Sequence, residues 1–382
     1  MRSGSDVDAD DGATHNPANS DRWMLKQPGR YVMRRREFLK STAVLAAAGT
    51  VPALPAIGQS KPSQIVYMTW GGLWGNALKG SMDKAFEAET GVKLVQDNSG
   101  DPVGRIAKLK IGLSDQKHDL LALHDGNFAL AVKQGVLEKI DRNSPRLTHL
   151  KDVYPQMVHD HWIAHIFNAV GITYHKDMKN PPQSWADLWR PELRGKIILP
   201  EVVHSIGLYI VAIGAIAAGK GPKDAEAGFE MLKRMRDLKP LFVQDTDSIM
   251  NAFLSGEAQV GLLYKSQTHT IKDKGAPVEW VFPKEGGIEI AWGTGIAKGT
   301  KNLEWAERYL NVQCDPMHQT AFAHTFNYGG SNPKSLAHLP PNLQERVRFS
   351  DEEIKRMVRL DHGFMADVKA EWIDRWNRVI AG

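Results

Sequence analysis

Residues 65–72 read Ile-Val-Tyr-Met-Thr-Trp-Gly-Gly, and residues 119–126 read Asp-Leu-Leu-Ala-Leu-His-Asp-Gly. Each contains a short apolar run, as expected of a buried strand, and stops at a turn that contains glycine. A stretch with Leu78, Met82 and Phe86 at helical spacing lies between them. Strand, glycine-bearing loop and helix in alternation predict an α/β fold built on a parallel sheet.

The same alternation continues along the rest of the chain. A chain of 382 residues is too long for one ordinary core, so its length predicts two lobes. With 42% hydrophobic and 24% charged residues, the composition is that of a soluble globular protein. Further strands are expected at residues 92–95, 171–174, 196–199, 260–264 and 278–282, and helices at 184–189, 206–218, 224–238, 303–312 and 351–378.

Charge and cysteine content exclude several classes of function. A net charge of +4, spread over 48 basic and 44 acidic residues, lacks the clustered basic surface of a nucleic-acid-binding protein. The single cysteine, Cys314, excludes an intramolecular disulfide, a CxxC redox pair and a cysteine zinc site. It falls in a helix-like stretch, which favours a buried, inert thiol over a nucleophile. We expect neither a metal nor a cofactor.

Residues 33–58 carry the marks of an export signal. The run 34–40 reads Arg-Arg-Arg-Glu-Phe-Leu-Lys, an alanine-rich apolar run follows it, and the pair Arg35-Arg36 is the hallmark of twin-arginine export. The apolar run contains Gly49 and two prolines and is shorter than a membrane span, so a membrane anchor is the weaker alternative. The pattern therefore predicts a twin-arginine signal peptide and the twin-arginine translocase as a partner during export.

The export signal sets the expected location of the mature chain. A bacterial lipoprotein carries a cysteine directly after its signal, and none lies there, so we expect a free periplasmic protein. Cleavage is expected after Ala53 or Ala56. Residues 1–32 are polar and lack an apolar period, which predicts a disordered or non-native extension and a translation start at Met33.

Five segments, in chain order, carry a resemblance to a known family. They are residues 86–93 (Phe-Glu-Ala-Glu-Thr-Gly-Val-Lys), 135–141 (Gly-Val-Leu-Glu-Lys-Ile-Asp), 184–196 (Ser-Trp-Ala-Asp-Leu-Trp-Arg-Pro-Glu-Leu-Arg-Gly-Lys), 283–287 (Pro-Lys-Glu-Gly-Gly) and 297–302 (Ala-Lys-Gly-Thr-Lys-Asn). These segments resemble the extracellular solute-binding proteins of ABC transporters, of the class that binds spermidine, putrescine or iron. The similarity extends from about residue 65 to residue 334.

The resemblance implies a two-lobed α/β fold of the periplasmic-binding-protein type II, with two strands that cross between the lobes and a ligand held between them. It divides the chain as follows: residues 63–166 and 288–335 form lobe 1, residues 167–287 form lobe 2, and helices in 336–382 pack on both. It also implies a monomer that delivers its solute to the membrane subunits of an ABC permease.

In open α/β sheets ligands lie beyond the carboxyl ends of the strands, so the strand-end loops provide the expected ligand contacts. In lobe 1 these are Trp70, Ser99, Asp101, His124 and Asp125, and in lobe 2 they are Glu201, His204, Ser205, Asp247, Tyr264 and Lys265. The resemblance adds Trp292 and Tyr328, on the segment that returns past the cleft. Some of these residues have structural alternatives: Trp70 as a core residue, His124 as a loop cap, and Glu201 and Asp247 as helix caps.

The resemblance leaves three classes of ligand to consider: polyamines, iron, and anionic or zwitterionic solutes. Polyamine-binding members hold their cationic ligand with aromatic rings and carboxylates. This chain has Tyr264 where those members usually have tryptophan, and Ile290-Ala291-Trp292 where they have Trp-x-Asp. Iron-binding members use adjacent tyrosines, and this chain has no Tyr-Tyr pair. Compared with the polyamine-binding members, this chain lacks acids at some of the expected ligand positions and has basic or neutral side chains among them, namely His124, His204 and Lys265. This difference favours an anionic or zwitterionic solute: an organic acid, an amino acid derivative or an amino-phosphonate. Polyamine binding is the alternative.

Two further alternatives concern metal and enzyme chemistry. His161 and His165 have the spacing of one helix face, and with His159 they suggest zinc, but no carboxylate or cysteine completes the site. No GxSxG, HExxH, GxGxxG or GxxxxGK[ST] motif occurs, which argues against a secreted enzyme and places ATP chemistry on another chain. The expected mechanism is closure of the lobes about a hinge, in a transporter subunit or a ligand sensor.

Overall fold

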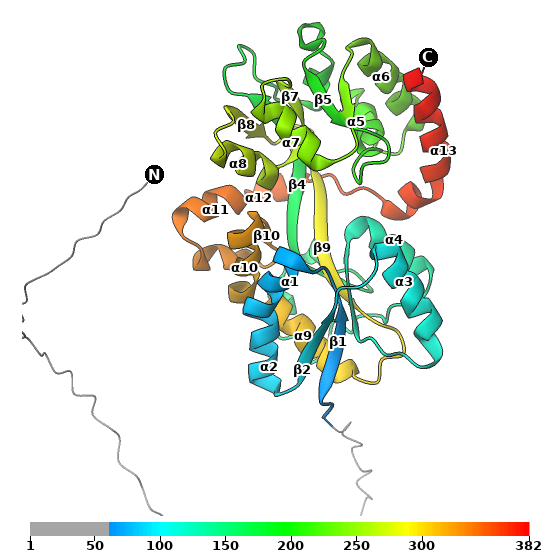
Figure 1. Cartoon of the computed structure of the whole chain (residues 1–382), viewed down its shortest axis with the longest axis vertical. Helices are drawn as coiled ribbons and strands as arrows, with labels where there is room; N and C mark the ends of the chain where they lie inside the picture. The colour runs from blue at the N-terminus through cyan, green and yellow to red at the C-terminus, as the bar shows by residue number, and fades with distance from the viewer. Residues whose placement is uncertain (1–60, 382) are drawn as a thin grey trace, which may run out of the picture. The chain divides into compact units, whose positions relative to one another are not determined.

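A computed structural model describes residues 61–381 (Figure 1). The N-terminal extension and the predicted signal peptide lie outside the described residues. The strands are β1 (Gln64–Met68), β2 (Lys93–Asp97), β3 (Leu120–His124), β4 (Ile163–His175), β5 (Ile197–Pro200), β6 (Leu241–Val243), β7 (Val260–Tyr264), β8 (Val278–Val281), β9 (Ile288–Ile296) and β10 (Gly329–Gly330).

Thirteen α-helices lie in the described part of the chain, joined in places by 3-10 turns and by one π-helical segment, Lys79–Asp83. They are α1 (Gly72–Leu78), α2 (Lys84–Thr90), α3 (Pro102–Ile111), α4 (Asp125–Lys133), α5 (Tyr209–Ala217), α6 (Ala225–Asp237), α7 (Thr246–Leu254), α8 (Lys265–Asp273), α9 (Leu303–Cys314), α10 (Pro316–Phe326), α11 (Pro341–Val347), α12 (Asp351–Arg356) and α13 (His362–Ala381).

The strands form one mixed sheet in the order β2-β1-β3-β9-β4-β7-β5-β6, with β8 and β10 also paired to β4. The outer groups, β2-β1-β3 and β7-β5-β6, are parallel. The two central strands, β4 and β9, are antiparallel to their neighbours and run from one group to the other (Figure 1). The predicted two-lobed α/β class with two crossover strands is therefore confirmed.

Each end of the sheet has its own apolar core, and the change from one core to the other falls inside the crossover strands. In β4, Ala169 packs in the first core and Val170 in the second; in β9 the change lies between Ile290 and Ala291. Within lobe 2 the sheet is covered on both faces, because alternate residues of β7 point to opposite sides and Leu263 packs in a separate cluster under α7 and α8.

Strand β4 begins earlier than the strand expected at 171–174. The sequence analysis left a helix around His161 and His165 as an alternative, whereas β4 already begins at Ile163. His165 is a buried strand residue, and the His161 ring contacts the Glu138 carbonyl oxygen at 3.0 Å. The two histidines therefore do not share a helix face. Within residues 61–381 no group of three or more His, Cys, Asp or Glu is placed to hold a metal ion.

The C-terminal segment packs against both lobes. The single helix expected at 351–378 is divided into α12 and α13, and Val358 in the break pairs with Ile288 at the start of β9. Helix α13 packs on lobe 2 through Trp372 and Trp376, which are 1% and 2% exposed. On the lobe 1 side, α13 is held to α4 by the ion pair between Lys133 and Asp367 at 2.7 Å, and α11 is held to α8 of lobe 2 by the ion pair between Arg346 and Asp273 at 2.5 Å.

Two other features bear on the expected class of protein. Cys314 is buried, and burial raises the pKa of its thiol to about 12, so a nucleophilic thiolate is not present at neutral pH. Among residues 61–381, no helix combines the length and the apolar character needed to cross a membrane.

The contact between the C-terminal segment and β9 is tested at Gly286. This residue has a φ of 110°, and a Cβ atom there would collide with the carbonyl oxygen of Arg356. We expect Gly286→Ala to lower the free energy of unfolding by about 2 kcal/mol or more, because an L-residue is strained at this φ and the opposing backbone must move. Gly221→Ala, which has open space around it, is the control and should change stability by less than about 0.5 kcal/mol. Urea denaturation of both variants measures the difference, and equal effects would contradict the observed packing.

Candidate functional site

Aromatic side chains from both lobes meet around Trp292, in the middle of the crossover strand β9. The Trp292 ring stacks on Tyr328, with centroids 4.6 Å apart and planes at 12°. It also contacts Tyr264 at the end of β7 in lobe 2, at 6.2 Å, and Trp74 in α1 of lobe 1, at 6.3 Å. We call this group, with Trp70, the aromatic cluster. Trp70, Trp74, Trp292 and Tyr328 are only partly buried, which is unusual for large rings that pack so closely and is typical of a binding surface.

The pairing of the strands explains why these rings share one face. His124 at the end of β3 pairs with Trp292, and Val170 in β4 pairs with Tyr264, so the side chains of each pair leave the same side of the sheet. A β-bulge in β4 between Ala164 and Ile166 contains His165, whose ring contacts Trp74 at 6.3 Å. Burial lowers the pKa of His165 to about 3, so this imidazole is neutral. It packs against the aromatic cluster through its contact with Trp74.

The lobe 1 side of the cluster begins at the end of β1. Trp70 makes an edge contact with Trp74 at 4.8 Å, and the Arg105 guanidinium lies 5.3 Å from the Trp70 ring. Ser99 is exposed and donates to Asp97, while Asp101 accepts the Gly104 N–H and so caps α3. The Asp101 carboxylate therefore has a structural partner, whereas Trp70 faces the other rings.

The lobe 2 side consists of the turn after β5 and the end of β7. One carboxylate oxygen of Glu201, Oε2, is buried and has no hydrogen-bond partner in the described part of the chain. His204 contacts Thr246 Oγ1 through Nε2 at 3.1 Å and accepts the Ile206 N–H, and burial lowers its pKa, so the ring is neutral. The Ser205 side chain lies close to the Tyr264 hydroxyl.

Two lobe 2 residues expected at the ligand have other positions. Lys265 donates to the carbonyl oxygens of Glu345 and Arg348 at the end of α11, at 3.3 and 2.6 Å. Asp247 is exposed in the first turn of α7, and the cap of that helix is Asp245. The structure therefore brings together Trp70, His124, Ser205, Tyr264, Trp292 and Tyr328, but not Asp101, Asp247 or Lys265.

Trp74 is a member of the aromatic cluster that the sequence analysis missed. It lies in the first turn of α1, which starts at Gly72 shortly after Trp70, and the two rings make an edge contact. A second tryptophan four residues after the one at the strand end is the signal in the sequence that points to it.

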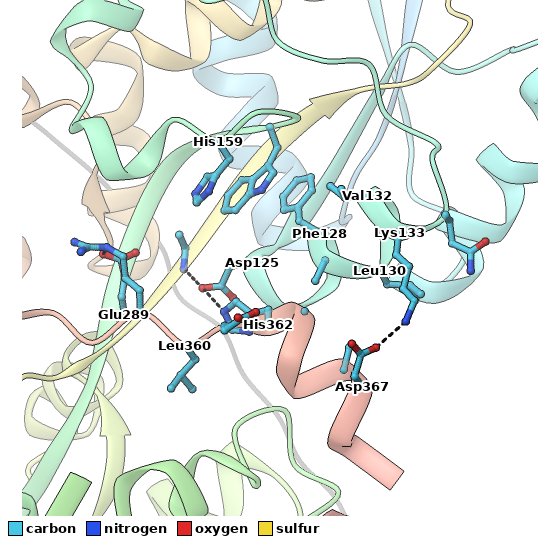
Figure 2. A pocket seen from close by; sticks show the side chains of 18 residues that line it. Asp125, Phe128, Leu130, Val132, Lys133, His159, Glu289, Leu360, His362 and Asp367 are labelled. Atoms are coloured by element: carbon cyan, nitrogen blue, oxygen red, sulfur yellow. Dashed lines mark hydrogen bonds and ion pairs between the residues drawn. The ribbon is translucent and has the colours of Figure 1, made fainter. Parts of the chain in front are cut away.

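Asp125 lies on the opposite side of β9 from the aromatic cluster. Its carboxylate accepts the Ala291 N–H at 3.0 Å and pairs with His362 at 3.4 Å. Glu289 and Ala291 line the same cavity of about 800 Å³, which also borders α4 and the start of α13 (Figure 2). Because side chains alternate along a strand, Trp292 points away from this cavity. We call it the hinge cavity, since it borders a crossover strand.

The charged groups of the hinge cavity are paired. Burial alone would raise the pKa of Asp125, but its interactions with His124 and His362 hold it below the usual range. The Asp125 carboxylate in turn raises the pKa of His362, against the effect of burial. Burial raises the pKa of Glu289 to about 7, and Arg359 contacts its carboxylate at 3.0 Å. Lys133 in α4 reaches Asp367 in α13 at 2.7 Å (Figure 2).

Comparison with known proteins identifies the family. The family model described as bacterial extracellular solute-binding protein matches residues 81–350. The chain belongs to this family. The resemblance that was found in the sequence is thereby confirmed, and in this solute-binding protein the two lobes present their rings on the face of β9 that carries Trp292.

Individual relatives agree with this assignment. The spermidine/putrescine-binding periplasmic protein of Escherichia coli is 26% identical over 291 residues, which is 73% of this chain and 82% of that protein. The gamma-aminobutyric acid-binding protein of Pseudomonas aeruginosa is 22% identical over 342 residues, or 85% and 93%. A crystal structure of an ABC transporter protein from Clostridium perfringens has the same fold, with a TM-score of 0.75, 23% identity, and coverage of 83% of this chain and 100% of that chain. The first two relatives are named as binding proteins, and the third is named as an ABC transporter.

The buried pair in the hinge cavity predicts a pH-dependent contribution to stability. Because the pKa of His362 is raised on folding, its stabilisation is complete below its unfolded pKa of about 6.5 and is lost as the pH rises through the folded value. We expect His362→Gln to destabilise this solute-binding protein by about 1 kcal/mol at a pH near 5.5 and by less at a pH near 8.5. Urea denaturation at the two pH values measures this. Lys133→Gln, which breaks the exposed pair with Asp367, is the control with no such dependence; the same loss at both pH values for His362→Gln would show that its charge contributes nothing.

Proposed function

We propose that this protein is the periplasmic substrate-binding component of an ABC uptake transporter and that it delivers a small polar organic solute to the membrane permease. The observation that carries the proposal is the aromatic cluster: Trp70 and Trp74 come from one lobe, Tyr264 from the other, and Trp292 from the strand between them. A solute on these rings touches both lobes at once, so its binding free energy favours the closed arrangement.

The proposed solute is an organic acid, an amino acid derivative or an amino-phosphonate. Two of the acids expected near the ligand, Asp101 and Asp247, cap a helix or lie exposed outside the cluster, so the rings are not surrounded by carboxylates. The relative from Pseudomonas aeruginosa that binds gamma-aminobutyric acid supports a zwitterion. A polyamine is the second candidate, because of the relative from Escherichia coli and because ring faces attract ammonium groups.

The proposed mechanism is hinge closure. The crossover strands β4 and β9 and the segment around Val358 are the connections that would bend or twist as the lobes approach. Closure over a ring-lined surface expels water and strengthens the polar contacts to the solute. A few charge-assisted hydrogen bonds and one stacked ring suffice for a micromolar dissociation constant, which corresponds to about −8 kcal/mol.

The closure proposal is tested by solution scattering. A thermal-shift screen of organic acids, amino acids, amino-phosphonates and polyamines first selects a stabilising solute. We expect this solute to reduce the radius of gyration, and we expect Trp292→Ala to weaken its binding by roughly tenfold or more through loss of the central ring. Trp305→Ala, which removes a partly buried tryptophan outside the cluster, is the control. A scattering curve that stays the same with saturating solute would overturn the closure mechanism.

We also propose that the precursor, starting at Met33, is exported by the twin-arginine route and that the mature protein is a free periplasmic monomer. Replacement of Arg35 and Arg36 by lysine should leave the precursor in the cytoplasm, because the paired arginines are the recognised feature. Fractionation of cells that express either form, with a twin-arginine-deficient strain as the control, measures this. Export of the Lys-Lys form in both strains would indicate a different route.

A further inference from the structure

Arg105 carries a positive charge that is almost completely buried in lobe 1. Its side chain is 3% exposed, its Nε donates to the Ser99 carbonyl oxygen at 3.3 Å, and its Nη1 is buried without a partner in the part of the chain that the structure describes. Burial lowers the pKa of Arg105, and the charges of Asp97 and Asp101 counteract this effect, but neither carboxylate forms an ion pair with it: Asp97 pairs with Lys108 and His118, and Asp101 caps α3. A buried charge without an ion pair is costly, and an anionic ligand beside it would offset part of that cost.

The position of Arg105 places this charge at the solute site. Trp70 and Ser99 follow β1 and β2, at the carboxyl edge of the parallel strands, and Arg105 contacts both. This edge is where ligands of open α/β sheets lie. From the Trp70 ring, contacts continue to Trp74 and on to Trp292, so the guanidinium lies at the lobe 1 end of the aromatic cluster.

A carboxylate lies in the turn after β5 of lobe 2. It belongs to Glu201, whose Oε2 atom is buried and has no hydrogen-bond partner among residues 61–381. Ser205, in the same turn, lies close to the hydroxyl of Tyr264, whose ring contacts Trp292. The guanidinium that contacts Trp70 and the carboxylate in the turn that carries Ser205 thus each have one buried polar atom without a hydrogen-bond partner among residues 61–381.

We propose that the solute is a zwitterion whose carboxylate or phosphonate pairs with Arg105 and whose ammonium pairs with Glu201, while its carbon chain lies along the aromatic cluster. This inference rests on the proposed function and assigns Arg105, which the sequence analysis did not consider, as the residue that selects the charge of the solute. The guanidinium repels the second ammonium of a diamine, and the Glu201 carboxylate repels the second carboxylate of a dicarboxylic acid.

Three matched series of linear compounds test the charge rule: putrescine and longer diamines, γ-aminobutyrate and longer ω-amino acids, and succinate and longer dicarboxylates. Isothermal titration calorimetry measures the affinity of each for the mature protein. We expect an ω-amino acid to bind best. Arg105→Met should weaken its binding by roughly 10- to 100-fold, the range for loss of a hydrogen bond to a charged group, and shift the preference toward the diamine. Glu201→Gln should shift the preference toward the dicarboxylate.

Arg308→Met is the matched control. The Arg308 guanidinium lies 5.5 Å from the Trp305 ring, much as Arg105 lies over Trp70, but it pairs with Glu304 and has no contact with the aromatic cluster. Its affinities should equal those of the wild type.

Thermal unfolding without solute separates binding from folding. Since Arg105→Met removes an unpaired buried charge and keeps an apolar stem, the solute-free variant should unfold at the same temperature or a higher one. A less stable variant with unchanged affinity for the ω-amino acid would show a structural role and overturn the inference, leaving the proposed function intact. Binding of diamines alone, or of none of the three series, would overturn both the zwitterion and the proposed class of solute.

Discussion

The antiparallel ladder between β4 and β9 is the constraint on which the other features depend. The pairing runs from Ile163 with Thr294 to Val170 with Ile288, and both strands leave one apolar core and enter the other along it. A backbone ladder fixes register, and register fixes which side chains share a face. The position of Trp292 between Trp74 and Tyr264 therefore follows from the register of β9 on β4, which is fixed by the backbone pairs along the whole ladder.

The two faces of β9 have different chemistry because of this alternation. On one face the rings are only partly buried, and the polar atoms near them, including Thr69 Oγ1, Trp74 Nε1 and both ring nitrogens of His165, have no partner among the described residues. On the other face, Glu289 and the neighbouring Asp125 are paired with Arg359 and His362. Partly buried rings leave a surface that a solute can contact, whereas a face whose charges are paired holds the chain together.

The sequence predicted the elements with strong local signals. The apolar runs at β1, β3 and β7 are buried strands, and Ser184 caps the turn at residues 185–189 through a capping box, as its position before Trp185 suggested. It did not predict the length of β4, because both faces of the strand are buried from Ile163 to Thr173, so the sequence shows no alternation of polar and apolar residues there. It also did not predict that Asp125 meets the face of β9 opposite the aromatic cluster, since periodicity does not tell which face of a later strand a helix N-terminus will meet.

The sequence analysis did not consider Arg105, because local periodicity does not show the three-dimensional surroundings of a side chain. On α3, Arg105 occupies a buried position next to Ile106 and Leu109, so its pattern in sequence is that of an ordinary amphipathic helix. Only the three-dimensional neighbourhood shows that Asp97 is already paired with Lys108 and His118. The charges that stabilise the fold are recognised by the partners that they have, as with Glu307, Arg146 and Ser144. A charge that selects a solute has no such partner until the solute binds. This lack of a partner is visible only in the packing of the folded lobes and not in any local sequence motif.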